Sequence, residues 1–329
     1  MSHRKDTDYL AISARIRAME NRLLNRERLD RIIDARDDQE ARKVLVECGY
    51  PDLAGAGLEQ MLTRVREETV KDLTAAVPGE PGLEIFKLKY DYHNAKTILK
   101  GQAMGVDAGR LLLKGGRYDP AVLLTQWQQE SLSGCADSFR RAMEQAGAVL
   151  KETKDPQQAD LLLDKAMYAE MTGMAKDSGS AFLQGYVRVL VDAANLRTAV
   201  RVYRMGKEDE FLRSVLLDGG NVSANTIAAA RGEGIADVFQ SGALSQAARL
   251  GAALIKPGSG ALTVFEKACD DAVTNYVAAG RRIPFGEQVV IGYLYAKEAE
   301  LTAVRTIFAG RAAKLDGDTI RRRLRDTYC

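Results

Sequence analysis

The chain has 329 residues, enough for two or three domains with substantial cores. Its 47 basic and 45 acidic side chains leave a formal net charge of +2, which excludes the strong positive field of a protein that captures nucleic acid. Aromatic residues make up only 6% of the chain and prolines number 7, so the composition favours an all-α fold over a sheet.

The cysteines and histidines are too few and too scattered to predict a metal centre or a disulfide framework. No C-x-x-C pair occurs, and the chain has only two histidines. The longest apolar run, 289–296, is far too short to cross a bilayer, and the N-terminal residues lack the apolar core of a signal peptide. We therefore expect a reduced, cytoplasmic protein with no metal and no cofactor.

Residues 9–36 carry apolar side chains at helical steps. Ile12, Ile16, Met19 and Leu23 follow one another at intervals of four, three and four residues, and the pattern resumes after a small drift in phase with 29, 32 and 33. This pattern predicts one long amphipathic helix of ~40 Å.

Residues 81–105 have the start and stop signals of a helix. Pro81 suits the first turn because its missing N–H would lack a partner there anyway, and Gly105 suits a left-handed C-terminal cap. Two further segments, 181–206 and 285–310, have a similar length and end in the same way, so we predict three long helices.

Shorter helices and turns fill the spaces between the long helices. We predict short helices at 119–130 and 223–231, and the clearest loop at 256–260. Arg281-Arg282-Ile283-Pro284 marks a boundary before the last long helix.

One block recurs three times at the ends of the long helices. It begins at Thr97, Thr198 and Thr302, 101 and 104 residues apart, and consists of Thr, two apolar residues, a base and then Gly five residues later. A Leu-Leu-x-Gly-Gly element follows the first two copies, at 112–116 and 216–220. The chain is therefore predicted to contain about three homologous modules.

Long helices are expected to start near residues 9, 81, 181 and 285, which gives four openings, but the last one leaves only some 45 residues before position 329, too few for a module of its own. The simplest solution is that the C-terminal segment packs against the N-terminal one. We expect a first module of 1–80 with 285–329, a second of 81–180 and a third of 181–284, arranged around a pseudo-threefold axis.

Basic side chains near the repeated block are the candidates for partner contact, namely Lys96, Lys100, Arg197, Arg201 and Arg305. In each block the Thr and the base, three residues apart, lie on one helical face. The functional interpretation has these bases meeting an acidic partner. In the structural alternative, each Thr bonds to its own helix and each base stabilises the helix C-terminus by ~0.3–1 kcal/mol.

A second repeated pair, Asp-x-x-Asn, occurs at 91–94 and 192–195, but the third copy has Ala296 and Ala299. Paired carboxylates in a cleft are needed for acid–base catalysis, and these positions supply none. We expect a polar network on the helix face, with Glu298 and Glu300 serving the last copy in a shifted way.

The glycine-rich segments do not match a nucleotide site or a nucleophile elbow. Residues 258–260 have neither the G-x-x-x-x-G-K-[ST] pattern nor the G-x-S-x-G spacing, and His93 is the only histidine beyond the N-terminal residues. No catalytic residue is predicted.

Three segments resemble a central-stalk component of V-type and archaeal-type ATPases, known as the C subunit in prokaryotes and the d subunit in eukaryotes. They are Tyr9–Leu24, Phe86–Thr97 and Ile291–Gly310 with the following Ile320-Arg321. The resemblance implies an all-helical funnel of three similar modules that caps the membrane proteolipid ring and receives the axle formed by the D and F subunits. It implies a rotor socket without chemistry of its own, on the cytoplasmic face, touching the membrane only through the ring.

Two other classes stay open at this point. A cytosolic helical-repeat adaptor would stack its modules as an open solenoid, whereas the truncated last opening, near residue 285, favours a closed ring. An enzyme using the Asp-x-x-Asn faces would need a catalytic motif, and the chain has none that we recognise.

Overall fold

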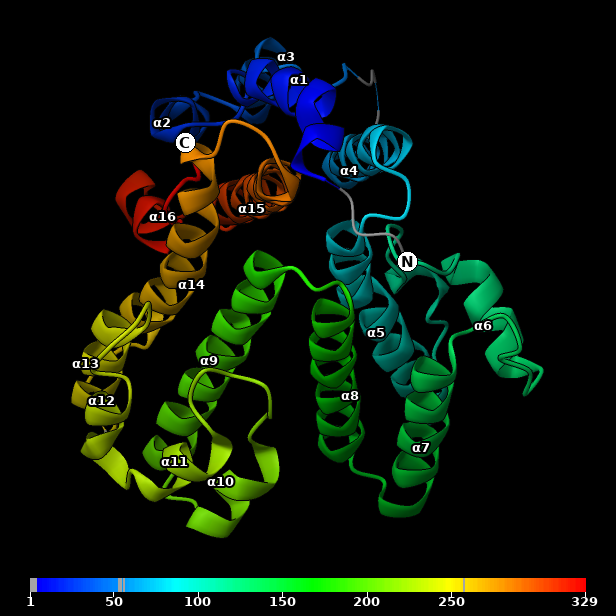
Figure 1. Cartoon of the computed structure of the whole chain (residues 1–329), viewed down its shortest axis with the longest axis vertical. Helices are drawn as coiled ribbons and strands as arrows, with labels where there is room; N and C mark the ends of the chain where they lie inside the picture. Colours follow the sequence, from blue (N-terminus) through cyan, green and yellow to red (C-terminus); the bar gives the residue numbers. More distant parts are fainter. Residues whose placement is uncertain (1–4, 53–54, 56, 257) are drawn as a thin grey trace. The chain divides into compact units, whose positions relative to one another are not determined.

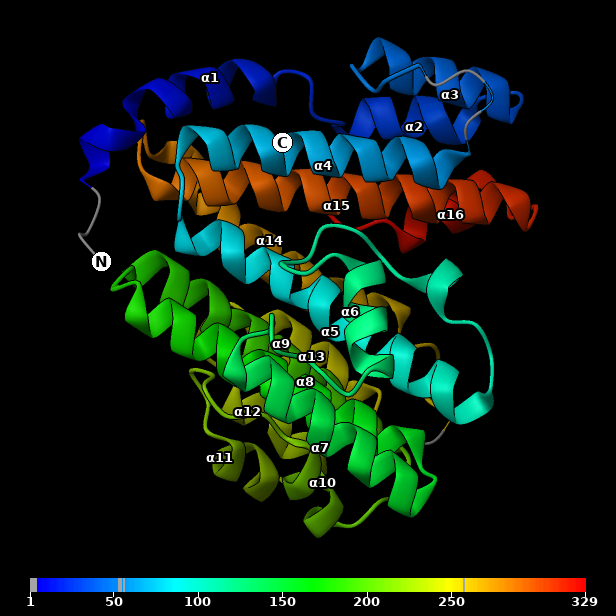
Figure 2. The same ribbon diagram turned by 90° about the vertical axis from the view of Figure 1, so that its right-hand side faces the viewer.

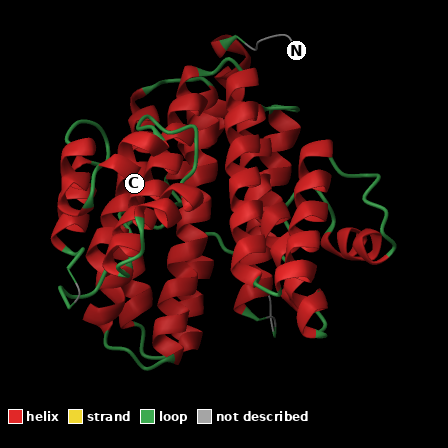
Figure 3. Cartoon of the chain, turned by 90° about the horizontal axis from the view of Figure 1, so that it is seen from below, coloured by secondary structure: helices red, strands yellow, loops and turns green. Residues whose placement is uncertain are grey.

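The computed structural model describes residues 5–52, 55, 57–256 and 258–329. Helices account for 73% of the chain, and the described residues contain sixteen α-helices and no strand (Figure 3). The all-α class predicted from composition is confirmed.

The chain divides into two compact units. The first unit holds Met1–Pro78, Arg188–Leu216 and Gly220–Cys329, and the second holds Gly79–Val187 with Leu217–Gly219. The finer division into three modules, and their pseudo-threefold arrangement, stays a prediction.

The first unit contains both ends of the described chain. Its α-helices, drawn in Figure 1, are α1 (Leu10–Glu20), α2 (Arg26–Asp34), α3 (Asp38–Glu47), α4 (Leu58–Ala76), α10 (Asp209–Val215), α11 (Ala224–Ala229), α12 (Ile235–Val238), α13 (Ser245–Ala253), α14 (Thr263–Ala278), α15 (Glu287–Ala312) and α16 (Gly317–Arg323). Short 3-10 turns occur at Asp6–Tyr9, Gly232–Gly234 and Ala279–Arg282. The long helix α9 (Ala181–Arg204) begins in the second unit and ends in the first.

One hydrophobic core joins the N-terminal helices to the C-terminal ones. Leu29, Leu45 and Leu62, from α2, α3 and α4, are buried in the same cluster as Leu301 of α15 and Ile320 of α16. Figure 2 shows α4 running alongside α15. Segments more than 200 residues apart in the sequence are thus held together by shared apolar burial.

The single long helix predicted for 9–36 is wrong, because the helix stops at Glu20 and restarts at Arg26. Asn25 caps the new helix by accepting the N–H of Arg28 at 3.0 Å. The intervening Leu24 is buried and donates its N–H to Glu300 of α15 at 2.6 Å. This tertiary bond breaks the helix where the apolar pattern drifts in phase.

The second unit is built on three packed helices. Its elements are α5 (Pro81–Met104), a 3-10 turn (Gly109–Leu111), α6 (Pro120–Gln128), α7 (Asp137–Thr153) and α8 (Pro156–Asp177), and α5, α7 and α8 pack against one another (Figures 1 and 2). The ring of Phe139 lies at the centre, 5.2 Å from Tyr92 and 5.1 Å from Tyr118. Such edge-to-face and tilted aromatic contacts add to the apolar burial of the bundle.

Two of the predicted long helices end as the sequence indicates. Gly105 follows α5 with φ of 66°, and Gly206 follows α9 with φ of 63°, both in the left-handed region. The third prediction is wrong at its end, because α15 continues through Gly310 to Ala312. A Cβ at Gly310 would lie 2.7 Å from Ile320, so this glycine permits the close approach of α16.

The shorter elements follow the sequence signals. Asp119 caps α6, and Ser223 caps α11 by accepting the N–H of Thr226, which confirms the two predicted short helices. In the predicted loop at 256–260, Gly258 and Gly260 have positive φ, whereas Pro257 lies outside the described residues.

We expect Leu62→Ala to lower the free energy of unfolding by about 2–5 kcal/mol, because it removes buried methyl groups from the core that α4 shares with α15. Urea unfolding followed by circular dichroism measures this loss. The matched control is Leu10→Ala at a position that is 49% exposed, where we expect little change. An equal effect of the two substitutions would contradict the packing of α4 on α15.

Candidate functional site

Bases on α5 pair with carboxylates on α8 in the second unit. Lys96 Nζ lies 2.5 Å from Asp164, and Lys100 Nζ lies 2.5 Å from Asp160. A step of four residues along α5 corresponds to a step of four in the opposite direction along α8. The two helices are therefore antiparallel, and the ion pairs form two successive rungs between them.

The same arrangement recurs in the first unit between α9 and α14. Arg197 contacts Asp270 at 2.5 Å, and Arg201 contacts Glu266 at 2.5 Å, again with steps of four in opposite directions. Arg325 from the C-terminal segment also binds Asp270, at 2.6 Å through its other carboxylate oxygen.

The third long helix has a modified version of these rungs with α4. The Nε of Arg305 lies 2.9 and 3.0 Å from the two oxygens of Glu59. The second rung has its charges reversed, because Glu298 on α15 accepts from Arg66 on α4 at 3.2 Å. The side chain of Arg66 is only 3% exposed, so this rung is buried.

We call the six contacts between helices, without that of Arg325, the inter-helix ion pairs. Each of the five bases predicted as a partner contact takes part in one, and whether any of them also meets a partner stays a prediction. The back-bonding expected of the threonines occurs at Thr302, which donates to the carbonyl of Glu298 at 2.9 Å. The sequence analysis missed the acidic partners, although carboxylates spaced by four on α8 and α14 were a visible signal.

The Asp-x-x-Asn pair on α5 holds the loop that follows the helix. Asp91 is fully buried and accepts the N–H groups of Arg117 at 2.9 Å and of Tyr118 at 3.4 Å. Asn94 forms two bonds with the backbone of Leu113, each 2.8 Å long. A side chain at Gly116 would collide with the Asp91 carboxylate, which explains the second glycine of the Leu-Leu-x-Gly-Gly element.

Asp192 on α9 has the same function in the first unit. It accepts the N–H of Asn221 at 3.1 Å, the side-chain amide of Asn221 at 2.8 Å and the N–H of Val222 at 3.1 Å. A side chain at Gly220 would again collide with the carboxylate. The two repeated sequence elements are therefore the two halves of one contact between helix and loop.

On α15, Glu300 serves as the buried acceptor in place of Ala296. It accepts the N–H of Leu24 at 2.6 Å and the hydroxyl of Tyr50 at 2.6 Å, and Lys297 lies 2.7 Å away. Glu298 pairs with Arg66 instead. The shifted use of these two glutamates in the last copy is thus observed, with separate partners for each.

Arg117 is a further residue of this network that the sequence analysis missed. Its Nε binds Asp91 at 2.6 Å and its Nη1 binds Glu170 of α8 at 2.7 Å, while the hydroxyl of Tyr92 donates to Glu170 at 2.8 Å. These two carboxylates raise the pKa of the Arg117 guanidinium despite its burial. The loop is therefore tied to two helices by one permanently charged side chain.

Burial dominates the electrostatics of both loop-holding aspartates. It raises the pKa of Asp91, with Arg117 opposing the shift, and it raises the pKa of Asp192, with the hydrogen bonds of Asn221 and Val222 opposing it. Since their oxygens are occupied by donors of the same chain, these carboxylates are structural acceptors rather than free acids or bases.

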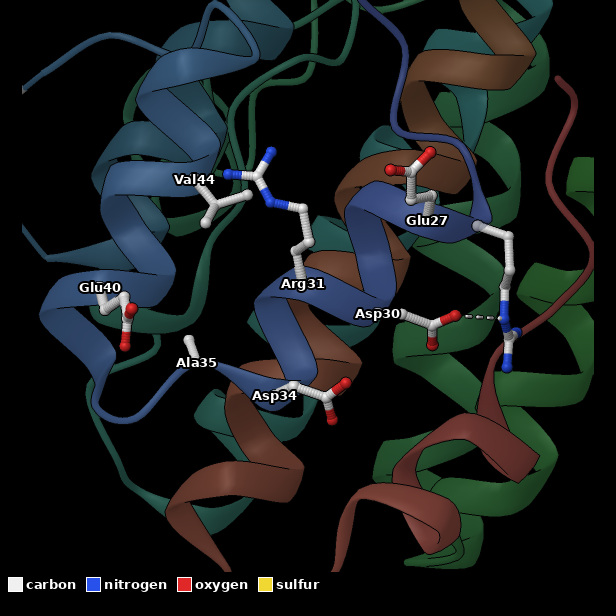
Figure 4. Close-up of a pocket in the computed structure, with 8 residues that line it drawn as sticks. Glu27, Asp30, Arg31, Asp34, Ala35, Glu40 and Val44 are labelled. Carbon is white, nitrogen blue, oxygen red and sulfur yellow. Dashed lines mark ion pairs between the residues drawn. The ribbon is translucent and has the colours of Figure 1, made fainter.

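A groove with a volume of about 690 Å³ lies on α2 and α3. Glu27, Asp30 and Asp34 project from α2 at its edge, and Arg26 pairs with Asp30 at 3.5 Å (Figure 4). Arg321 of α16 binds both Asp30 and Asp34, so two of these three carboxylates are paired within the chain. Within the described residues, no group of three or more His, Cys, Asp or Glu side chains could hold a metal ion, and no helix is long and apolar enough to cross a bilayer.

Residues 12–323 match the model of the ATP synthase (C/AC39) subunit family, so this chain belongs to that family. The C subunit of the V-type sodium ATPase of Enterococcus hirae is 20% identical over 98% of this chain and 99% of its own length. The C subunit of the V-type ATP synthase of Deinococcus radiodurans is 26% identical over 96% of this chain and 90% of its own length. The C subunit of the A-type ATP synthase of Methanococcoides burtonii is 25% identical over 97% of this chain and 94% of its own length.

We expect Arg201→Ala to lower the free energy of unfolding by at most ~1 kcal/mol, because its ion pair with Glu266 is half-exposed and screened by water. A double-mutant cycle with Glu266→Ala, read by urea unfolding, measures the coupling directly. A coupling free energy well above ~1 kcal/mol would contradict the interpretation of the Arg201–Glu266 contact as a weak surface ion pair.

We expect the free energy of unfolding to depend on pH in a way that reflects the burial of Asp192. Its raised pKa means that the folded protein takes up this proton at a higher pH than the unfolded chain does. The free energy of unfolding therefore gains a stabilising contribution as the pH falls toward about 4, and Asp192→Asn lacks this contribution.

Urea unfolding of both proteins between about pH 4 and pH 7 measures the difference. Asp218→Asn, at an exposed position of the same loop, is the control and should leave the profile of the native chain unchanged. A contribution of opposite sign in the native chain would show that Asp192 is stabilised in its charged form.

Proposed function

We propose that this chain is a non-catalytic central-stalk subunit of a rotary ATPase of the V or A type. It would act as a socket that couples the central axle of the D and F subunits to the membrane proteolipid ring. The observation that carries this proposal is the family match over residues 12–323, together with relatives named as C subunits of such ATPases that align along nearly their whole length.

The inter-helix ion pairs support a mechanical role. A socket that transmits torque must resist sliding and twisting of its helices, and α5, α9 and α15 are each tied to an antiparallel neighbour at two levels. Each exposed pair contributes little stability alone, but two rungs together fix the register of the two helices. The buried pair of Arg66 and Glu298 is costly to break, since either partner alone would be an uncompensated charge.

The hydrogen bonds of the buried carboxylates support the proposal that this subunit is non-catalytic. Asp91, Asp192 and Glu300 are the acids that a hidden active site would need, and each accepts hydrogen bonds from backbone N–H groups of its own chain. A group with its oxygens occupied in this way is not poised to exchange a proton with a substrate.

In this proposal the five predicted bases bind an acidic partner in addition to their own carboxylates. Arg201 is 53% exposed and Arg305 is 32% exposed, so each keeps donors directed to solvent while bound to its own carboxylate. An acidic group of the axle would bind the free donors of such a base while its ion pair within the chain stays intact. Contact with the membrane would come only through the ring, on the cytoplasmic face.

We expect the purified chain to bind the D and F subunits of its own organism, and to bind the isolated proteolipid ring separately. Both interfaces should weaken at high ionic strength, because charges such as Lys100 and Arg201 would be screened. Co-purification at low and high salt measures the two interactions.

The control for this experiment is ATP itself, for which calorimetry should detect no binding to the isolated chain. Failure to bind either partner at low salt, with the helical circular dichroism spectrum intact, would refute the socket. That outcome would favour the alternative of a cytosolic helical adaptor.

A further inference from the structure

A second, smaller pocket lies in the first unit and is rich in arginine. It has a volume of about 280 Å³ and lies where the connection between α1 and α2 meets the 3-10 turn Ala279–Arg282 and the C-terminal segment. Three guanidinium groups line it, from Arg17, Arg28 and Arg281, against the single acidic side chain of Glu20. The side chains of Asn21 and Asn25 complete its polar wall.

One of the three arginines is neutralised within the chain. Arg17 Nη1 binds both oxygens of Glu20, at 2.9 and 2.8 Å, and its Nη2 donates to the carbonyl of Ile283 at 2.5 Å. Cys329, the last residue of the structure, also lines the pocket, and an oxygen of its terminal carboxylate accepts the hydroxyl of Thr327 at 2.6 Å. The only acidic side chain of the pocket is therefore already paired, and neither it nor the terminal carboxylate forms an ion pair with Arg28 or Arg281.

Arg28 and Arg281 are held in place by carbonyl groups rather than by acids. Arg28 Nη1 donates to the carbonyls of Asn21 at 3.0 Å and Leu23 at 2.5 Å. Arg281 Nη1 donates to the carbonyl of Tyr328 at 3.1 Å, and its guanidinium lies 5.7 Å from the centre of the Tyr328 ring. No carboxylate among the described residues forms an ion pair with either of these two arginines.

This arrangement differs from that of the other arginines discussed above. Arg66, Arg197, Arg201, Arg305 and Arg321 each meet a carboxylate of the same chain. In the pocket, the carbonyl bonds use one nitrogen of each guanidinium and leave its Nε–H and Nη2–H groups for another acceptor. Because the groups are already positioned, binding an anion would cost little side-chain entropy.

We propose that this pocket binds a phosphate group. Two fixed guanidiniums from different segments offer donors from different directions, which suits the tetrahedral oxygens of phosphate better than the planar pair of a carboxylate. Three arginines face one glutamate and one terminal carboxylate, so the anion would compensate an excess of positive charge in the pocket. The inference rests on the pocket alone and is independent of the proposed socket function.

The test is isothermal titration calorimetry of the full chain with inorganic phosphate in a low-salt buffer. We expect saturable binding to the native chain and binding weakened by about tenfold or more in Arg281→Gln, which removes one charge-assisted donor pair. Arg281 is exposed, so this variant should fold, and circular dichroism checks that it does. The matched control is Arg141→Gln, an exposed arginine of α7 far from the pocket in sequence, which should bind phosphate like the native chain.

A second arm distinguishes free phosphate from a lipid headgroup. Vesicles of phosphatidylglycerol and of phosphatidylcholine are sedimented with the native chain and with Arg281→Gln. Retention by the phosphatidylglycerol vesicles that Arg281→Gln loses would identify a lipid phosphate, whereas phosphate binding without retention would identify a soluble one. Absence of saturable phosphate binding to the native chain, or equal binding by Arg281→Gln, would overturn the proposal.

Discussion

The three long helices are buried on several faces at once, and the rest of the fold follows from the need to cover them. In α15 the side chains from Val289 to Leu294 are buried in an unbroken run, which is more than a full helical turn. A helix buried all round must be sheathed by neighbours, and every charge it carries must find a partner. Antiparallel helices with complementary charges, and loops held by buried carboxylates, meet both requirements.

The parts of this fold that depend on local chemistry were predictable from the sequence. Proline at the start and glycine after the end indicated the limits of α5, and the glycine pairs at 115–116 and 219–220 placed the turns before α6 and α11. The helix expected over 9–36 failed because its interruption depends on Glu300, which lies 276 residues beyond Leu24. Gly310 was misread for a similar reason, since its small size serves the approach of Ile320 rather than a helix cap.

The same distinction between local signals and tertiary contacts applies to the candidate site. The bases could be placed on one helical face from their spacing, but their partners could not, because the register between two packed helices is a tertiary property. The repeated Asp-x-x-Asn and Leu-Leu-x-Gly-Gly elements were both visible as repeats, and only the structure shows that Asp91 and Asp192 bind the loops that contain those glycines. The phosphate pocket gave no sequence signal, since Arg28 and Arg281 are 253 residues apart.

The core shared by α2, α3, α4, α15 and α16 has a consequence for how the chain is made. The N-terminal helices leave the ribosome more than 200 residues before the C-terminal helices that cover them. At a synthesis rate of about 5–20 residues per second, Leu29, Leu45 and Leu62 face water for roughly ten to fifty seconds. The beginning of this protein cannot finish folding until its end has been synthesised, so its earliest apolar surface is exposed to chaperones and to aggregation for most of translation.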